Sequence, residues 1–501
     1  MKRLIITYAA IVFILSFQSS FSQNYNDALL LSEPGLYTGA RALSMGNSFT
    51  SLSNDISGLL FNPAGIGLVK RVELSGGMNF NSFQNSTTLG MDLNSFQNSK
   101  TSFGTSTDAS KSSVNLNQFG LIYPLPVIQG SWVFAFGYNR VKDFNRTMKF
   151  DGFNPGNNSM IQTLTGDYNE QVPITNDLGL AYEIRNPQTD EYIRDTTLIN
   201  GLLNQSGGIK KQGSIDKWSF ATSIEVVKGF YIGGSFNILS GRYKSDSDYQ
   251  EDDTRNYYGP TLELVPGDVT TRNFQSFNLN DVIEWDLSGW DTQLGLLYNW
   301  IDKFRFGASI KFPSYYTIKE DYLVIADSYF GAGNGYSLNP AINDPIKYKI
   351  KTPFEYSFGA STTISIITVA GDLKIMDYTQ MEFTEGFDYT YRAARKKEIE
   401  NLFSTTIDYH LGAEVKIPKL PIFGRAGFMY LKSPYADDPS EFDKKFLTVG
   451  GGALIDNMFG IDVAYAYGWW KDFGDNYGVN VSRTFQDISV NNLILNLSVK
   501  L

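Results

Sequence analysis

Residues 458–470 read MFGIDVAYAYGWW, and large apolar residues alternate with small or polar ones along the whole stretch. Successive side chains of a β-strand point to opposite faces of the sheet. One face of such a strand would carry Phe459, Ile461, Val463, Tyr465, Tyr467 and Trp469, and the other Gly460, Asp462, Ala464, Ala466 and Gly468. The first face suits lipid and the second a lumen, which is typical of a strand in a transmembrane β-barrel.

The same alternation recurs along the chain in fourteen segments. Very short connections, as at 126–129, 227–229 and 455–457, alternate with long polar ones, as in bacterial barrels. A weaker segment around Leu178–Ile184 is assigned to an outer loop, because a fifteenth wall strand would make the count odd. The predicted strands are Lys70–Phe83, Val114–Leu125, Gly130–Arg146, Ile215–Val226, Phe230–Lys244, Glu284–Trp300, Lys303–Lys319, Lys347–Ser365, Ile367–Glu382, Thr405–Ile417, Pro421–Pro434, Lys445–Leu454, Met458–Trp470 and Ser489–Leu501. The sequence therefore predicts an all-β fold, an antiparallel transmembrane barrel over residues 70–501.

The N-terminus has the layout of a secretory signal peptide. Lys2 and Arg3 precede an apolar run over residues 4–17 and then small polar residues. The run is shorter than the ~20 residues that a membrane-spanning helix needs. We expect residues 1–22 to be a cleaved signal peptide, with the mature chain starting at Gln23.

The composition narrows the function. The chain has 36 Phe, 30 Tyr and 7 Trp, and aromatic residues gather where a barrel wall meets the membrane surfaces. The absence of Cys excludes disulfides, thiolate metal sites and lipoprotein acylation. A net charge of -10 argues against nucleic acid as a partner. With a single His and no metal-binding spacing, we expect no metal and no cofactor.

Residues 23–69 do not alternate, and their small residues and short helical pieces suggest a compact plug inside the barrel. This segment contains Asn62, Pro63 and Ala64, followed by Gly65. Here the sequence resembles the FadL/TodX family of outer-membrane transporters for long-chain fatty acids and other hydrophobic compounds, whose N-terminal hatch carries an Asn-Pro-Ala motif. Further similar segments follow in the order of the family at 290–313, 353–378, 411–414, 425–428, 433–434 and 450–465.

The resemblance implies a barrel whose lumen is blocked by the hatch. A hydrophobic ligand binds inside, the hatch shifts, and the ligand leaves sideways through the wall near the third strand. In this chain the third strand holds Phe136, Gly137 and Tyr138, which we predict as the lateral gate, with the hatch motif held against it. An equally good interpretation of Gly137 is that it makes space for a neighbouring side chain.

The predicted lumenal faces carry charged residues, and the cations among them are candidates for contact with a ligand carboxylate. Most of them should pair with each other or with the plug, because an unmatched charge in a partly dry interior is costly. The predicted members are Glu225, Asp372, Asp408, His410, Glu414 and Asp462, with four cations as candidate carboxylate contacts, Arg305, Lys311, Lys374 and Arg425.

Three other functions compete with transport. An outer-membrane lipase or acyltransferase needs a base beside its nucleophile, and we interpret His410 as structural, so we expect no enzyme. A haem receptor would have only His410 as an axial ligand. A carrier of secreted proteins would suit the long outer loops, and sequence alone does not separate it from transport. A plain porin is disfavoured by the plug.

We therefore predict an outer-membrane protein of a Gram-negative bacterium that takes up long-chain fatty acids or other hydrophobic compounds. The expected partners are a hydrophobic small molecule, outer-membrane lipid and lipopolysaccharide. The last strand, 489–501, resembles the C-terminal signal that barrel assembly machinery reads, although Leu501 replaces the usual aromatic residue.

Overall fold

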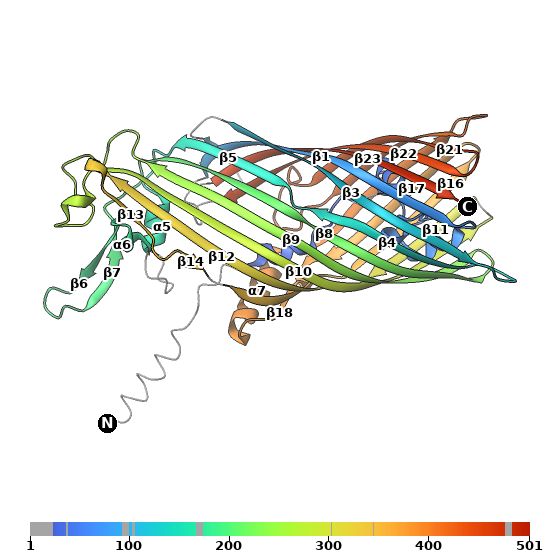
Figure 1. Ribbon diagram of the computed structural model, residues 1–501, viewed down its shortest axis with the longest axis horizontal. Helices are drawn as coiled ribbons and strands as arrows, with labels where there is room; N and C mark the ends of the chain where they lie inside the picture. Colours follow the sequence, from blue (N-terminus) through green and yellow to red (C-terminus); the bar gives the residue numbers. More distant parts are fainter. Residues whose placement is uncertain are drawn as a thin grey trace, which may run out of the picture.

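The structure is a computed structural model that describes residues 24–36, 39–92, 100–102, 106–166, 174–301, 303–343, 345–475 and 483–501. The predicted signal peptide lies outside the described residues. The described strands form a closed antiparallel barrel, and the N-terminal residues from 24 to 69 lie in its lumen (Figure 1). No helix in this part of the chain is long and apolar enough to cross a membrane.

The barrel wall is made of fourteen successive antiparallel strands, as predicted, and four of them, the third included, are divided into two pieces by a short break. β1 pairs with β23 from Glu73 opposite Lys500 to Gly90 opposite Arg483, which closes the barrel. The wall elements are β1 (Glu73–Asp92), β3 (Thr107–Leu125), β4 (Trp132–Asp143) with β5 (Arg146–Phe153), β8 (Asn204–Val227), β9 (Phe230–Asp252), β10 (Phe274–Trp300), β11 (Phe304–Lys311) with β12 (Tyr315–Phe330), β15 (Ile346–Lys351) with β16 (Glu355–Ile364), β17 (Ile367–Asp377) with β18 (Glu382–Glu385), β19 (Thr405–Lys416), β20 (Ile422–Leu431), β21 (Lys444–Ile455), β22 (Phe459–Asp475) and β23 (Arg483–Lys500).

The remaining elements lie in the lumen or beyond the wall. Those of the lumen are α2 (Tyr25–Ser32), α3 (Ala40–Ser44), α4 (Gly58–Phe61) and the 3-10 helix η1 (Pro63–Leu68). The connections contain β2 (Lys100–Ser102), α5 (Met160–Gly166), α6 (Ile174–Asp177), β6 (Tyr182–Arg185), β7 (Tyr192–Thr196), η2 (Val269–Thr271), η3 (Gly331–Gly333), β13 (Gly335–Ser337), β14 (Ile342–Asn343), η4 (Tyr378–Gln380) and α7 (Tyr389–Leu402). β6 and β7 pair in a separate two-stranded sheet, so the segment around Leu178–Ile184 is outside the wall, as expected.

Many wall strands run further toward the long loops than predicted. β8 begins at Asn204 where we expected Ile215, and β10 begins at Phe274 where we expected Glu284. The added part of β8, Asn204–Gly213, carries mostly polar side chains on both faces. The added part of β10 instead carries Phe274 and Phe277, which are buried in an apolar cluster. The pattern therefore marks the lipid-facing part of each strand.

The outer surface of the wall carries the predicted apolar band. On β22, Phe459, Val463 and Tyr465 are each 40–49% exposed, whereas Ala464 and Ala466 are buried. Trp290 of β10 stacks on Tyr315 of β12, with ring centroids 5.1 Å apart. Large exposed apolar and aromatic side chains of this kind form the lipid-facing belt of transmembrane barrels.

Candidate functional site

The Asn-Pro-Ala motif forms hydrogen bonds within the hatch and between the hatch and the wall. Asn62 is the N-cap of η1, and its Oδ1 accepts a hydrogen bond from the backbone N–H of Ala64 at 3.0 Å. Its Nδ2 donates to the carbonyl oxygens of Thr50 and of Leu296 in β10, each at 2.9 Å. Asn62 is fully buried, so every one of these bonds satisfies a group that water does not reach.

Two facing glycines in the wall make room for the motif. Gly233 of β9 lies opposite Gly295 of β10. A Cβ on Gly295 would lie 2.0 Å from Asn62 Oδ1, and one on Gly233 would lie 2.4 Å from the nitrogen of Ala64. The motif is therefore seated on the fifth and sixth strands of the wall, and the prediction that it lies against the third strand is wrong.

The same arrangement recurs around the hatch in four cross-strand glycine pairs of the described wall. Besides Gly233 and Gly295, Gly307 faces Gly359 beneath Thr50, Gly412 faces Gly427 beneath Met45 and Gly46, and Gly120 faces Gly137 beneath Ile56 and Leu59. We call these the glycine seats. At each seat the wall presents bare backbone, so the hatch approaches more closely than any side chain would allow.

Gly137 therefore has the role of making space. It pairs regularly with Gly120 of β3 and with Ser219 of β8, so the wall has no break in pairing at this position. A Cβ on Gly137 would lie 2.6 Å from Leu59 Cδ1 of the hatch. Phe136 and Tyr138 lie on the other face, where both contact Trp218.

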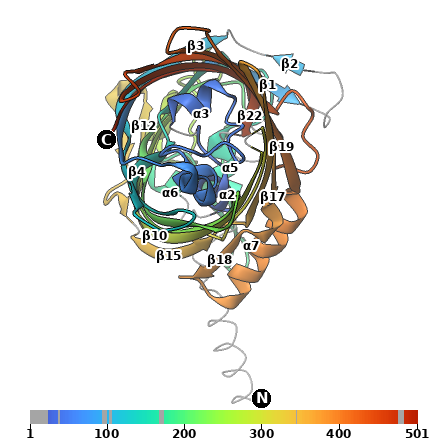
Figure 2. The same cartoon turned by 90° about the vertical axis from the view of Figure 1, so that its right-hand side faces the viewer.

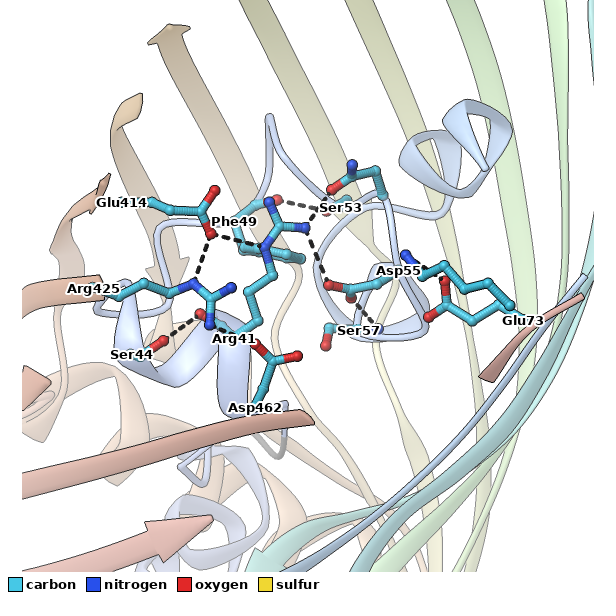
Figure 3. Close-up of polar contacts among 12 residues, drawn as sticks. Arg41, Ser44, Phe49, Ser53, Asp55, Ser57, Glu73, Glu414, Arg425 and Asp462 are labelled. Atoms are coloured by element: carbon cyan, nitrogen blue, oxygen red, sulfur yellow. Dashed lines mark hydrogen bonds and ion pairs between the residues drawn. The ribbon is translucent and has the colours of Figure 1, made fainter. Parts of the chain in front are cut away.

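A buried cluster of charges joins the hatch to the late strands (Figure 3). Arg41 Nε lies 3.3 Å from Glu414 Oε2, and its Nη1 lies 3.5 Å from Asp55 Oδ2. Arg425 lies 2.6 Å from the same Glu414 oxygen and 2.5 Å from Asp462 Oδ1. Burial opposes the charge of Arg41, but the carboxylates of Glu414 and Asp55 outweigh it and raise its pKa above the ordinary value. The cluster thus holds α3 by paired charges.

Two further wall side chains satisfy the backbone of the hatch. Asp372 Oδ2 accepts from the backbone N–H groups of Phe49 at 2.8 Å and Thr50 at 2.7 Å. His410 Nδ1 lies 2.9 Å from the carbonyl oxygen of Gly46 and is buried. This contact supports the structural interpretation of His410 over a catalytic or haem-binding one.

Arg425, Lys374 and Lys311 each have an acidic neighbour on the wall. Arg425 pairs with Glu414 and Asp462, Lys374 lies 2.9 Å from Glu355, and Lys311 lies 3.9 Å from Asp291. Arg305 is half-buried on β11, opposite Asn299 close to a short turn. The pairing that we expected for most lumenal charges is present, and the four cations do not form one group.

The third strand separates from β3 beyond Asn139 but stays paired with β8. Its pairing with β3 ends at Asn139 opposite Gln118, its register on β8 shifts between Arg140 and Lys142, and it divides into β4 and β5. β5 then lies on the lumenal side: Arg146 stacks on Phe83 of β1, and the Thr147 carbonyl accepts from Asn85. Among the described residues, 107–117 of β3 thus pair with β1 and not with the third strand.

We call the opening between residues 107–117 of β3 and residues 140–145 the third-strand gap. Polar side chains bridge it: Asp143 Oδ2 accepts from Ser113 Oγ at 3.0 Å and from Asn115 Nδ2 at 3.2 Å. Arg140 donates to Asn115 and lies 3.1 Å from Asp216. An open groove of about 570 Å³ begins here at Asn115, Arg140 and Asn145 and continues across β8, β9 and β10 past Arg242 and Asp286.

Sequence reasoning missed the residues of the gap. The available signal was the adjacent pair Lys142-Asp143, which interrupts the apolar alternation of a strand that is otherwise regular from Trp132 to Tyr138. Two charges in succession cannot both face the same side of a strand, and a register shift accompanies them here.

Comparisons with known proteins identify the fold. No family model matches the chain, and no curated protein matches it in sequence. A solved FadL homologue of Pseudomonas aeruginosa is similar in structure, with a TM-score of 0.55 and 12% identity over 94% of this chain and 99% of that one. The toluene transporter TodX of Pseudomonas putida has a TM-score of 0.50 and 13% identity over 93% of this chain and 98% of that one.

The chain therefore has the fold of the FadL-type barrels, as the resemblance in sequence implied. A TodX mutant described as a monoaromatic hydrocarbon channel has a TM-score of 0.51 and 14% identity, covering 93% of this chain and 99% of that one. Two of these neighbours are named as a transporter and a channel.

Proposed function

We propose that this chain is an outer-membrane channel for hydrophobic molecules, with long-chain fatty acids as the leading class, and that its ligand leaves sideways through the third-strand gap. The outer apolar band, the seated hatch and the similar fold of a toluene transporter and a FadL homologue support this proposal. In the same proposal, the chain is exported by a cleaved signal peptide and inserted by barrel assembly machinery, and it contacts outer-membrane lipid and lipopolysaccharide.

The observation that carries the proposal is the separation of β5 from β3, while β5 stays paired with β8. It leaves residues 107–117 of β3 as a sheet edge, with no strand partner on the side away from β1. An apolar molecule gains about 0.8 kcal/mol for each CH₂ group removed from water, so leaving the lumen for lipid is favourable and leaving it for aqueous periplasm is opposed. An opening in the wall provides the favourable route.

The gap is closed by polar contacts in this structure. Asp143, Ser113, Asn115 and Arg140 hold its two sides together. Passage of a ligand requires these contacts to separate, so we place the gate at the gap, and Phe136, Gly137 and Tyr138 lie on the paired part of the strand below it. Movement of the hatch at the Gly137 seat would loosen the strand that carries the gate.

The proposed function is tested by uptake in a Gram-negative host that lacks its own long-chain fatty acid transporter. Cells that produce the full chain should accumulate labelled oleate or toluene faster than cells that produce the same chain cross-linked between hatch and wall. Equal uptake by producing and non-producing cells for both compounds, with the barrel correctly assembled in the outer membrane, would refute transport of either class.

A further inference from the structure

Strands β9, β10, β12 and β15 are neighbours in the wall. In Figure 2, β10 and β15 lie on the lower side of the barrel, near β18 and the outer helix α7. On the outer face, apolar side chains give way to polar ones toward the long loops, since Trp290 is followed by Ser288 on β10 and Tyr315 by Thr317 on β12. Aromatic residues mark the edge of a lipid-facing band, so this line is the outer boundary of the hydrocarbon region.

A row of charged side chains crosses the four strands just beyond this boundary. Arg242 is opposite Asp286, Asp286 is opposite Lys319, and Lys319 is opposite Lys347. All four side chains are exposed. Asp286 is four residues beyond Trp290, about 13 Å along the strand, or about 10 Å along the membrane normal at the usual tilt of barrel strands. The row therefore lies at the level of the lipid head groups.

Lys319 and Lys347 differ from the other cations on the outer face of these four strands. Among the described residues, neither lysine is in an ion pair. The other cations of this face each have an acidic partner: Arg242 with Asp286 at 3.3 Å, Lys244 with Glu284 at 2.6 Å, Lys349 with Glu385 at 2.7 Å and Lys351 with Glu382 at 3.8 Å. Pairing is thus the rule on this surface, and the two lysines are the exception.

The two lysines also face each other across the sheet. They are direct partners in the register of β12 and β15, and like charges directly opposite each other destabilise a sheet. Asp286, which is opposite Lys319 on its other side, is already paired with Arg242, and Asp321 is two residues further along β12. An anion held between the two ammonium groups would turn this repulsion into attraction.

We infer that Lys319 and Lys347 together bind the phosphate group of a phosphorylated lipid in the outer leaflet. A phosphate monoester carries up to two negative charges, which match two ammonium groups, and lysine is a common ligand of phosphate. The position at the head-group level favours a lipid as the source, because the long apolar stems of lysine can lie along the lipid band while their charges stay at its surface. This inference rests on the proposed outer-membrane location and adds a lipid site outside the lumen.

The place of the pair in the sheet predicts what binding does to the wall. The ladder between β12 and β15 is short and runs from Tyr315 opposite Lys351 to Glu320 opposite Ile346. Lys319 and Lys347 are therefore one pair away from the end at which the two strands separate. A phosphate bound by both side chains would hold this end of the ladder together, so binding should stabilise the barrel.

The test measures urea unfolding of the full chain in neutral detergent, with bisphosphorylated lipid A, with dephosphorylated lipid A or with inorganic phosphate. Only bisphosphorylated lipid A should raise the urea midpoint of the unmodified chain through this pair. Lys347→Glu should raise the midpoint without lipid, because it creates an opposite-charge pair with Lys319. The same change should lower the affinity for bisphosphorylated lipid A about tenfold, as read by native mass spectrometry.

The control is Lys228→Glu, which makes the same charge change in the exposed short turn at the other end of β9 and should leave lipid binding unchanged. Lys347→Gln, which removes the repulsion without adding an anion, serves if Lys347→Glu does not assemble, and it should also weaken lipid binding. Bisphosphorylated lipid A that binds the Lys347 variants as tightly as the unmodified chain, or no more tightly than the dephosphorylated lipid, would overturn the inference.

Two further outcomes are separate. Inorganic phosphate that stabilises the barrel as much as lipid A does would overturn the lipid as the source of the phosphate. Because the pair lies outside the lumen, uptake of labelled oleate should be equal in the unmodified chain and in Lys347→Glu. Uptake without any phosphate-dependent lipid binding would refute this inference alone, whereas such binding without uptake would refute the proposed function alone.

Discussion

Residues 39–69 and residues 24–36 both fill the lumen, but they are held to the wall by different kinds of contact. The first segment rests on the glycine seats and on directional bonds of Asn62, Asp372 and Glu414. The second is held by apolar side chains, with Lys142 and Lys444 at one end. The comparison indicates one fixed part of the plug and one part that a ligand can replace.

The physical reason lies in what can substitute for each contact. A buried hydrogen bond or ion pair that loses its partner leaves an unsatisfied group at a large cost. An apolar contact can be made equally well by another apolar molecule, because dispersion and the hydrophobic effect are not directional. Residues 24–36 can therefore be exchanged for a hydrophobic ligand, whereas residues 39–69 form the fixed part of the plug.

The largest expected effect is on the charge cluster of the fixed segment. Arg425→Met leaves Glu414 with Arg41 alone and leaves Asp462 without its guanidinium partner. We expect the free energy of unfolding to fall by about 4 kcal/mol, the usual cost of breaking a buried ion pair. Urea unfolding of the folded barrel measures it. Lys471→Met, which breaks the exposed pair with Glu441 at 2.7 Å, should cost less than about 1 kcal/mol. Equal losses would show that the buried cluster stabilises the barrel no more than an exposed pair does.

A methyl group at a glycine seat should have the next largest effect. Gly295→Ala places a Cβ 2.0 Å from Asn62 Oδ1, so the motif must shift. We expect a loss of about 3 kcal/mol, typical of overpacking, and faster proteolysis within the hatch. Gly424→Ala is the matched control, because a Cβ there meets nothing within 4 Å. If both variants are as stable as the unmodified chain, close seating of the hatch is refuted.

The sequence predicted the wall well because the feature that places a strand in a membrane is local. Apolar residues at every second position are visible in any single stretch, as in residues 458–470. The extension of β8 was missed because no apolar face marks it. That of β10 was missed because its Phe274 and Phe277 do not continue the alternation of residues 284–300. The hatch was recognised by Asn62, Pro63 and Ala64, but its seat was not, because Gly233 and Gly295 become neighbours only through the register of β9 and β10.

The third-strand gap was also not predicted from the sequence, because it depends on contacts between distant segments. Gly137 was predicted either as part of a lateral gate or as a residue that makes space for a neighbouring side chain. The contact with Leu59, which lies far away in sequence, explains why a glycine stands there. The interruption lies at Arg140–Asn145, and it depends on contacts with β1, β3 and β8 that no local pattern contains. Long-range contacts decided both points.

A smaller effect is expected in the replaceable segment. Leu29→Ala removes one apolar side chain of α2 from the cluster with Trp285 and Tyr348. We expect the local free energy of opening of residues 24–36 to fall by about 2 kcal/mol while that of residues 39–69 stays unchanged. Hydrogen exchange read by mass spectrometry separates the two segments. Faster exchange in both would mean that they open as one body, against the division proposed above.

The central claim is that a hydrophobic ligand leaves through the third-strand gap, and cross-linking the gap tests it most directly. The chain has no native Cys, so Ser113→Cys with Asp143→Cys gives a unique pair at side chains whose oxygen atoms lie 3.0 Å apart across the gap. The control pair is Thr363→Cys with Thr368→Cys, whose hydroxyl oxygens also lie 3.0 Å apart but between regularly paired β16 and β17. A short, reducible bis-methanethiosulfonate joins either pair.

The measurement is uptake of labelled oleate by cells that carry each cross-linked barrel, before and after the linker is reduced. The account predicts that uptake through the Ser113–Asp143 pair falls to the level of cells without the protein and returns on reduction, while the control pair transports throughout. Undiminished uptake with the third-strand gap fully cross-linked would contradict lateral exit at this position.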